Sequence, residues 1–136
     1  MTWGRGSHAS TFGGNPVACA AALATLDLLE GGLVAHAADV GSYLKEQLRT
    51  MAARREAIGD VRGIGLMVGV DFVKDRRTRE GDAETRNRVV QEAFRRGLLV
   101  LGCGESTMRL SPPLVITRRQ VDTALEILDA AIAAAC

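Results

Sequence analysis

The sequence predicts an α+β domain in which helices pack on a small, mainly antiparallel sheet. Segments with an apolar residue at every third or fourth position predict helices, and shorter segments with an apolar residue at every second position predict strands. Glycines and prolines separate these segments. The expected order is helix, helix, strand, helix, strand, strand, helix, without an internal repeat or a low-complexity run.

The chain opens with a loop rich in glycine and hydroxyl residues, over residues 4–14, which has neither helical nor strand periodicity. Asn15 followed by Pro16 predicts a helix start, because asparagine caps a free N–H and proline has none to lose at the first helical position. We expect this helix to run from Pro16 to about Glu30 and to stop at Gly31-Gly32. It is apolar on nearly every side, so another surface should cover it.

The second helix is amphipathic, since its apolar residues recur at steps of three or four: Leu33, Ala37, Val40, Leu44, Leu48 and Met51. Lys45 falls on the outward, solvated face. Residues 61–73 alternate with the period of a strand and predict one strand, with Leu66 and Val68 on the same side. Lys74–Asp82 is expected to be a charged loop.

Asp82 predicts the cap of a third helix that runs through Arg96 and buries Val89, Val90, Ala93 and Phe94. Two short strands follow, over Leu98–Leu101 and Thr107–Leu110, joined by a turn at residues 102–104. Pro112-Pro113 ends the strand pairing. Thr117 and Gln120 predict a capping box for the last helix, which has one apolar face.

Size and charge narrow the class of protein. With 136 residues, 47% of them hydrophobic and 24% charged, the chain is expected to form one globular domain. A net charge of +1 argues against nucleic acid and anionic membranes as partners. We expect no apolar stretch of about 20 residues and no secretory signal, and therefore a cytoplasmic protein. The three cysteines are expected to be reduced thiols, with no zinc-type spacing and hence no metal site.

Two places could carry chemistry. The loop from Ser10 to Pro16 combines two hydroxyls, glycine N–H groups and a helix start, which suits an anion such as phosphate. An ordinary capped turn is the alternative. Arg109, in an apolar strand, could hold a carboxylate through two parallel hydrogen bonds, or could simply point into water. The phosphate-binding P-loop and the zinc motif H-E-x-x-H do not occur in the sequence.

Four segments occur in a distinctive order along the chain: Gly6-x-His8-x-Ser10-Thr11-Phe12-Gly13-Gly14-Asn15-Pro16, residues 61–70, residues 98–104 and Arg109-Leu110-Ser111-Pro112-Pro113-Leu114. Together they closely resemble the C-terminal part of class III pyridoxal-phosphate aminotransferases, a family that includes enzymes for 4-aminobutyrate, N-acetylornithine and ornithine. The resemblance extends from about Trp3 to the C-terminus.

The resemblance implies the fold of the C-terminal domain of fold-type I pyridoxal-phosphate-dependent transferases, and a division into a connector with the phosphate-binding loop (1–15) and the small domain (16–136). It implies that Ser10 and Thr11 bind the cofactor phosphate of the neighbouring subunit in a homo-oligomer. It also implies that Arg109 binds the carboxylate of the substrate. The implied reaction is amino-group transfer from an amino acid to a 2-oxo acid, with pyridoxal 5'-phosphate in the complete enzyme.

One departure from the family is large. The family's Schiff-base lysine belongs to a preceding cofactor-binding domain, and neither Lys45 nor Lys74 matches its surroundings. We therefore expect no catalytic residue here, and a chain that is inactive without a large domain or a split-enzyme partner. A free-standing interaction module that keeps the fold without catalysis is the alternative.

Overall fold

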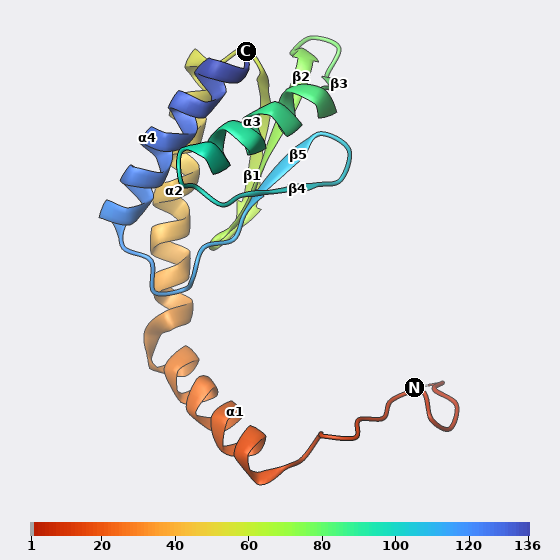
Figure 1. The fold of residues 1–136 in the computed structure, drawn as a ribbon. Helices are drawn as coiled ribbons and strands as arrows, with labels where there is room; N and C mark the ends of the chain where they lie inside the picture. The colour runs from red at the N-terminus through yellow and green to blue at the C-terminus, as the bar shows by residue number, and fades with distance from the viewer. Residues whose placement is uncertain (1) are drawn as a thin grey trace. The chain divides into compact units, whose positions relative to one another are not determined.

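The computed structural model describes residues 2–136, and the chain divides into two compact units, Met1–Val34 and Ala35–Cys136 (Figure 1). The first unit holds a loop, helix α1 (Pro16–Leu28) and a π-helical turn (Leu29–Leu33). Asn15 caps α1 as predicted, since its side-chain Oδ1 accepts the Ala18 N–H at 2.9 Å. No residue of α1 is buried. Within residues 2–136, this apolar helix therefore lacks the covering surface that its composition predicts.

The second unit contains most of α2 (Val34–Arg54) and all later elements. These are β1 (Ile58–Ile64), β2 (Met67–Asp75), β3 (Glu80–Gly81), α3 (Ala83–Arg95), β4 (Leu101–Cys103), β5 (Thr107–Leu110) and α4 (Arg118–Ala135). The sheet has the order β1-β2-β5-β4, with β3 paired to one end of β2, and every pairing is antiparallel. The α+β class is therefore confirmed.

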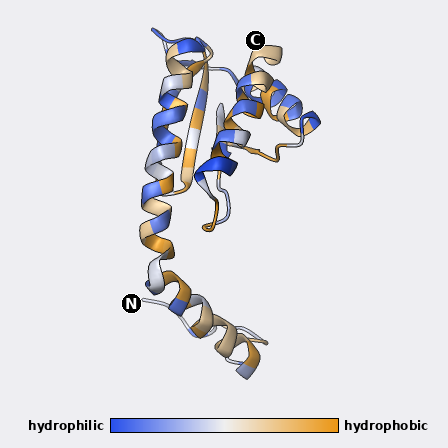
Figure 2. Ribbon diagram, turned by 90° about the vertical axis from the view of Figure 1, so that its left-hand side faces the viewer, coloured by the Kyte–Doolittle hydropathy of each residue, from blue (hydrophilic) through white to orange (hydrophobic). Residues whose placement is uncertain are grey.

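The core lies between one face of this sheet and the helices α2, α3 and α4 (Figure 1). The predicted apolar face of α2 is confirmed, and Figure 2 shows polar and apolar colours alternating along this helix. Val68, Val70 and Phe72 of β2 are completely buried on the core side. Arg62, Gly69, Asp71, Leu101, Thr107 and Arg109 point the other way, by the alternation along each strand and the register between strands. We call this second side the open face.

The single strand predicted over residues 61–73 is wrong, because a tight turn divides it into the hairpin β1–β2. Gly63 and Gly65 have φ values of +155° and +52°, which few other residues adopt. A Cβ on Gly63 would lie 2.2 Å from the Met67 carbonyl oxygen. The alternation around Leu66 and Val68 was predicted correctly, but the glycines that flank Ile64 are the turn signal.

Three further details differ from the prediction. Phe94 is 66% exposed rather than buried, because Val89 and Ala93 give α3 its fully buried contacts. The fourth strand begins at Leu101 instead of Leu98, since Leu101 is the residue paired with Arg109. The charged loop after Lys74 contains the short strand β3. The caps at Asp82 and Thr117 are confirmed, the latter as a complete capping box with Gln120.

The expectation of no membrane-length apolar stretch is corrected. The helical stretch Pro16–Arg54 is long and apolar enough, by length and composition alone, to cross a membrane. Helical hydrogen bonding continues past Gly31-Gly32, although Gly32 itself has a non-helical φ of +135°. These two criteria are weak evidence for a span, because apolar helices of soluble proteins also meet them.

The Asp82 cap leads to a pH-dependent prediction. Its carboxylate accepts the Thr85 N–H at 2.9 Å, and this bond lowers the pKa of Asp82 below its ordinary value of 3.8. A lowered folded-state pKa means that the stabilisation is present above pH 3.8 and is lost as the pH falls through the folded-state value. We expect Asp82→Ala to lower the free energy of unfolding by about 1 kcal/mol at pH 7.

Urea unfolding between pH 7 and pH 2.5 measures this effect. The difference between the natural chain and Asp82→Ala should shrink below about pH 4, because the protonated carboxyl loses its charge. Asp82→Asn is the matched control, since asparagine also caps helices and does not titrate. Its advantage over Asp82→Ala should stay constant with pH, and a natural chain that behaves the same way would contradict the prediction.

Candidate functional site

The predicted anion loop lies in the first unit and is exposed. Ser10 Oγ accepts the Gly13 N–H at 2.9 Å, which leaves the hydroxyl proton of Ser10 available to a ligand. Gly13 approaches Ser10 so closely that a Cβ there would lie 3.0 Å from the Ser10 Cβ. Within residues 2–136, the Thr11 hydroxyl has no hydrogen-bond partner. Both hydroxyls can therefore donate to an anion.

The start of α1 offers fewer free donors than the sequence suggested. Pro16 has no N–H, the Ala18 N–H is bound to the Asn15 side chain, and the Cys19 N–H donates to the Asn15 carbonyl at 3.0 Å. The Asn15 amide in turn donates to the Phe12 carbonyl at 2.7 Å. The structure thus contains the capped turn of the alternative interpretation. Anion binding at this loop would depend on the hydroxyls more than on the helix end.

Arg109 lies in the second unit, on the open face of the sheet. It is exposed and is paired with Gly69 of β2 on one side and Leu101 of β4 on the other. Within residues 2–136 it has no salt bridge, whereas Arg62, two strands away on the same face, is paired with acidic residues. Neither Gly69 nor Leu101 can compensate its charge, so the guanidinium is available for an anionic ligand.

A polar cluster beside Arg109 was not predicted. Arg62 contacts Asp60 at 3.0 Å and Asp71 at 3.6 Å, and these carboxylates raise the pKa of Arg62, chiefly through the hydrogen bond to Asp60. Arg62 also donates to Thr107 Oγ1 at 3.0 Å. The sequence does not single out Arg62 as a site residue, because the strand register that brings residues 62, 71 and 107 together is not visible in the sequence.

The two lysines have other roles. Lys45 donates to the Gly63 carbonyl at 3.1 Å and is half-buried, so the outward face on which it was predicted is partly covered at this residue. Lys74 forms a salt bridge with Glu80 at 2.5 Å, and this hydrogen bond raises the pKa of Lys74 above its ordinary value. A raised pKa keeps the amine protonated and therefore a poor nucleophile.

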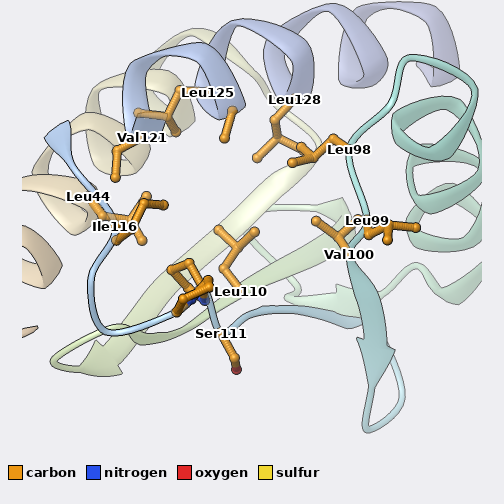
Figure 3. A pocket seen from close by; sticks show the side chains of 13 residues that line it. Leu44, Leu98, Leu99, Val100, Leu110, Ser111, Ile116, Val121, Leu125 and Leu128 are labelled. Carbon is orange, nitrogen blue, oxygen red and sulfur yellow. The ribbon is translucent and has the colours of Figure 1, made fainter. Parts of the chain in front are cut away.

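An apolar pocket of about 290 Å³ lies on the helix side of the sheet (Figure 3). Side chains from α2, α4, the end of β5 and the α3–β4 and β5–α4 connections line it, among them Leu98, Leu110, Ile116, Val121, Leu125 and Leu128. Ser111 is the polar residue among those that line it, and Figure 3 shows its hydroxyl pointing away from the others. Arg109 faces the opposite side of the sheet, so the pocket is not a carboxylate site.

The three predicted site residues occupy two separately described units, Ser10 and Thr11 in the first and Arg109 in the second. Among the described residues 2–136, the Ser10 and Thr11 hydroxyls and the Arg109 guanidinium are not paired with an acidic side chain. Donors of these types suit oxyanions, a phosphate in the first case and a carboxylate in the second. Within residues 2–136, these two places could therefore bind an anion, while Lys45 and Lys74 lack the surroundings of a reactive amine.

Comparisons with known proteins identify the family that the sequence motifs resemble. The family model "Aminotransferase class-III" matches residues 1–132. Isoleucine 2-epimerase of Lentilactobacillus buchneri is 43% identical over 94% of this chain, which covers 29% of that protein. Acetylornithine aminotransferase of Archaeoglobus fulgidus is 44% identical over 90% of this chain, which covers 28% of it.

The fold of the chain also matches solved transaminase structures. An amine transaminase from an uncultivated Pseudomonas species, solved in its PLP-bound form, superimposes with a TM-score of 0.87 at 42% identity. The match covers 97% of this chain and 30% of that structure. The chain therefore spans about three-tenths of the length of the relatives it matches and corresponds to one piece of such a protein. It belongs to the class III aminotransferase family.

Proposed function

We propose that this chain is the C-terminal portion of a pyridoxal-phosphate-dependent class III aminotransferase and supplies phosphate and carboxylate binding to it. The single observation that carries the proposal is the match of residues 1–132 to the family. Exposed, uncompensated donors at the loop and strand positions of the family's motifs support it. The complete enzyme would transfer an amino group from an amino acid, such as 4-aminobutyrate or acetylornithine, to a 2-oxo acid.

The family and its PLP-bound structural neighbour imply pyridoxal phosphate in the complete enzyme. The residues of the loop fit the phosphate end of this group, because the Ser10 hydroxyl keeps a free proton and Thr11 has no competing partner in residues 2–136. When bound, the cofactor supplies the electron sink for the bond changes at the amino-bearing carbon. Ser10 and Thr11 would hold its phosphate in a neighbouring subunit, and Arg109 would orient the carboxylate of the substrate.

The rest of the enzyme must come from outside this chain. The relatives are more than three times as long, and we propose that their remaining length corresponds to a larger cofactor-binding domain outside these 136 residues. Figure 2 shows apolar residues along α1, all of whose residues are exposed. We propose that the missing domain covers this helix, that the enzyme is a cytoplasmic homo-oligomer, and that residues 1–15 act as the connector to the small domain at 16–136.

The test compares the isolated chain with a complete enzyme. The complete enzyme is either the longer protein that contains this chain or a chimera in which it replaces the matching segment of the Archaeoglobus fulgidus acetylornithine aminotransferase. We expect the isolated chain to show no turnover and no stoichiometric borohydride-trapped cofactor adduct, because Lys74 is held by Glu80 and Lys45 by the Gly63 carbonyl. The complete enzyme should transfer amino groups. An adduct on Lys45 or Lys74 with turnover would contradict the proposal.

A second reaction must be measured in the same samples, because the isoleucine 2-epimerase of Lentilactobacillus buchneri is among the similar relatives. Phosphate and carboxylate binding serve epimerisation of an amino acid as well as amino transfer. The two outcomes differ in the product, since epimerisation changes the configuration of the amino acid and consumes no 2-oxo acid. Chiral analysis of the amino acid, with and without 2-oxo acid, separates them.

The interaction-module alternative predicts a different result. A module would bind a partner through the surface that the large domain covers in an enzyme, and would restore no turnover when that domain is supplied. Size-exclusion chromatography of the isolated chain, with and without the large domain, shows whether a complex forms. Complex formation together with turnover supports the enzyme piece, and complex formation without turnover supports the module.

A further inference from the structure

We propose that Asp71, Thr107 and Arg62 are positioning residues for Arg109. They form a ring of hydrogen bonds and ion pairs that fixes strand β5 on the open face of the sheet, directly beside the arginine. The inference rests on the proposed function, in which Arg109 binds the carboxylate of the substrate.

The ring closes through three contacts. Arg62 Nη2 donates to Thr107 Oγ1 at 3.0 Å, Thr107 Oγ1 donates to Asp71 Oδ1 at 2.8 Å, and Arg62 Nη1 lies 3.6 Å from Asp71 Oδ2. Ser106 Oγ adds a second donor to Asp71 Oδ1 at 2.9 Å. The Thr107 hydroxyl thus both accepts and donates, and the ring ties β1, β2 and β5 together across the sheet.

The ring lies next to Arg109 by strand register. Thr107 pairs with Asp71, and two residues further along, on the same face, Arg109 pairs with Gly69. Thr107 is only 8% exposed and the Asp71 side chain 25%, whereas the Arg62 side chain is 54% exposed, so the Thr107–Asp71 hydrogen bond is the shielded part of the ring. Breaking a shielded polar contact is costly, which makes the ring a strong constraint on β5.

Thr107 is also held from the core side of the sheet, through its backbone carbonyl. Arg86, buried under Gly102, donates to the Thr107 carbonyl at 3.1 Å and to the Glu105 carbonyl at 3.2 Å. Thr107 is therefore anchored through its side chain on one face and through its backbone on the other. Two residues along a strand are about 7 Å apart, so fixing Thr107 fixes the backbone from which the Arg109 side chain extends.

The ring also selects which arginine can bind an anion. Asp60 and Asp71 compensate the charge of Arg62, whereas Arg109 has no salt bridge within the described residues 2–136. On this face the described sheet thus presents one compensated and one uncompensated arginine, on either side of Gly69. A carboxylate should approach Arg109. Loss of Asp71 would loosen β5, while Asp60 at 3.0 Å would still compensate the charge of Arg62.

The first test uses Thr107→Val in the complete enzyme, which keeps the shape of the side chain and removes the hydroxyl. We expect KM for a carboxylate-bearing substrate to rise about tenfold with kcat unchanged. The reason is that the Arg109 side chain, which binds the carboxylate, is displaced and the reacting groups are not. An amine donor without that carboxylate should be unaffected. Thr107→Ser, which keeps the hydroxyl, should restore the natural KM.

The matched control is Asp129→Asn. Asp129 pairs with Arg55 at 2.8 Å, and its side chain is 28% exposed, close to the 25% of Asp71. Because this pair joins α4 to the end of α2 and does not touch β5, its loss should cost stability without changing KM. Asp71→Asn is the second ring variant and should behave as Thr107→Val does, so the test survives if one of the two fails to fold.

A second readout needs no activity. In the isolated chain, amide hydrogen exchange at Met108, Arg109 and Leu110 should be faster in Thr107→Val and Asp71→Asn than in Thr107→Ser and Asp129→Asn. Unchanged KM in both ring variants, an equal rise for both substrates, or the same effect from Asp129→Asn would overturn the inference. If Arg109→Lys itself leaves KM for the carboxylate-bearing substrate unchanged, the proposed role of Arg109 in binding the carboxylate is wrong. This result distinguishes a failure of the proposed function from a failure of the positioning inference.

Discussion

Changing Ser10 and Thr11 together to alanine should weaken cofactor binding by the complete enzyme about a hundredfold or more. Each hydroxyl is expected to donate a charge-assisted hydrogen bond to the phosphate, and each such bond contributes about 1.5–3 kcal/mol. The structure leaves both hydroxyls able to donate, because Ser10 Oγ is engaged only as an acceptor from Gly13 and Thr11 has no partner in residues 2–136. The dissociation constant of pyridoxal phosphate measures the effect.

Ser7→Ala is the matched control for this prediction. Ser7 belongs to the same exposed loop, and its hydroxyl is already used within the loop, where it donates to the Gly4 carbonyl at 2.8 Å. It should therefore leave the cofactor dissociation constant unchanged. Unchanged binding in the double variant would mean that the loop is only the capped turn that Asn15 forms at the start of α1. Equal losses in Ser7→Ala and the double variant would indicate disorder of the loop and not lost phosphate contacts.

The helices could be predicted from the sequence because their signals are local. Asn15, Asp82 and Thr117 each cap the helix that follows them, and the apolar steps along α2 mark its buried face correctly. The α+β class follows from the order of these elements. Such predictions succeed because a cap or an amphipathic face depends on residues three or four positions apart.

The sheet could be predicted only in part, because pairing depends on residues far apart in the chain. The hairpin turn at Gly63 and Gly65 was missed, since alternation continues on both sides of it. The position of β4 was shifted because Leu98 and Leu101 look equally suited to a strand, and only the pairing with Arg109 selects Leu101. Apolar composition does not determine register.

The residues of the candidate site likewise differ in whether the sequence alone could identify them. Ser10, Thr11 and Arg109 could be selected because their residue types and order resemble a family. The polar ring beside Arg109 could not, because Asp71 and Thr107 are 36 positions apart and meet only through the pairing of β2 with β5. A residue such as Arg62, which looks like an ordinary surface charge in the sequence, acquires a specific contact only in the folded sheet.

The second large effect is expected from Arg109→Lys in the complete enzyme, which should raise KM for a carboxylate-bearing substrate by about tenfold to a hundredfold. An arginine binds a carboxylate through two parallel N–H donors, whereas the lysine ammonium is a point charge that cannot reproduce this geometry. The loss of one charge-assisted bond, about 1.5–3 kcal/mol, sets the size of the effect. An amine donor without the carboxylate should keep its KM.

Stability should hardly change in this variant, which separates a lost clamp from a folding defect. Arg109 is exposed and has no salt bridge within residues 2–136, so Arg109→Lys should alter the free energy of unfolding by less than about 0.5 kcal/mol. A folding defect would depress the rates with both donors equally, while a lost clamp depresses the rate with one. Steady-state kinetics with the two donors, beside thermal unfolding of the same samples, decides between them. If both donors fall in parallel, Arg109 has a structural role and the carboxylate-clamp assignment is wrong.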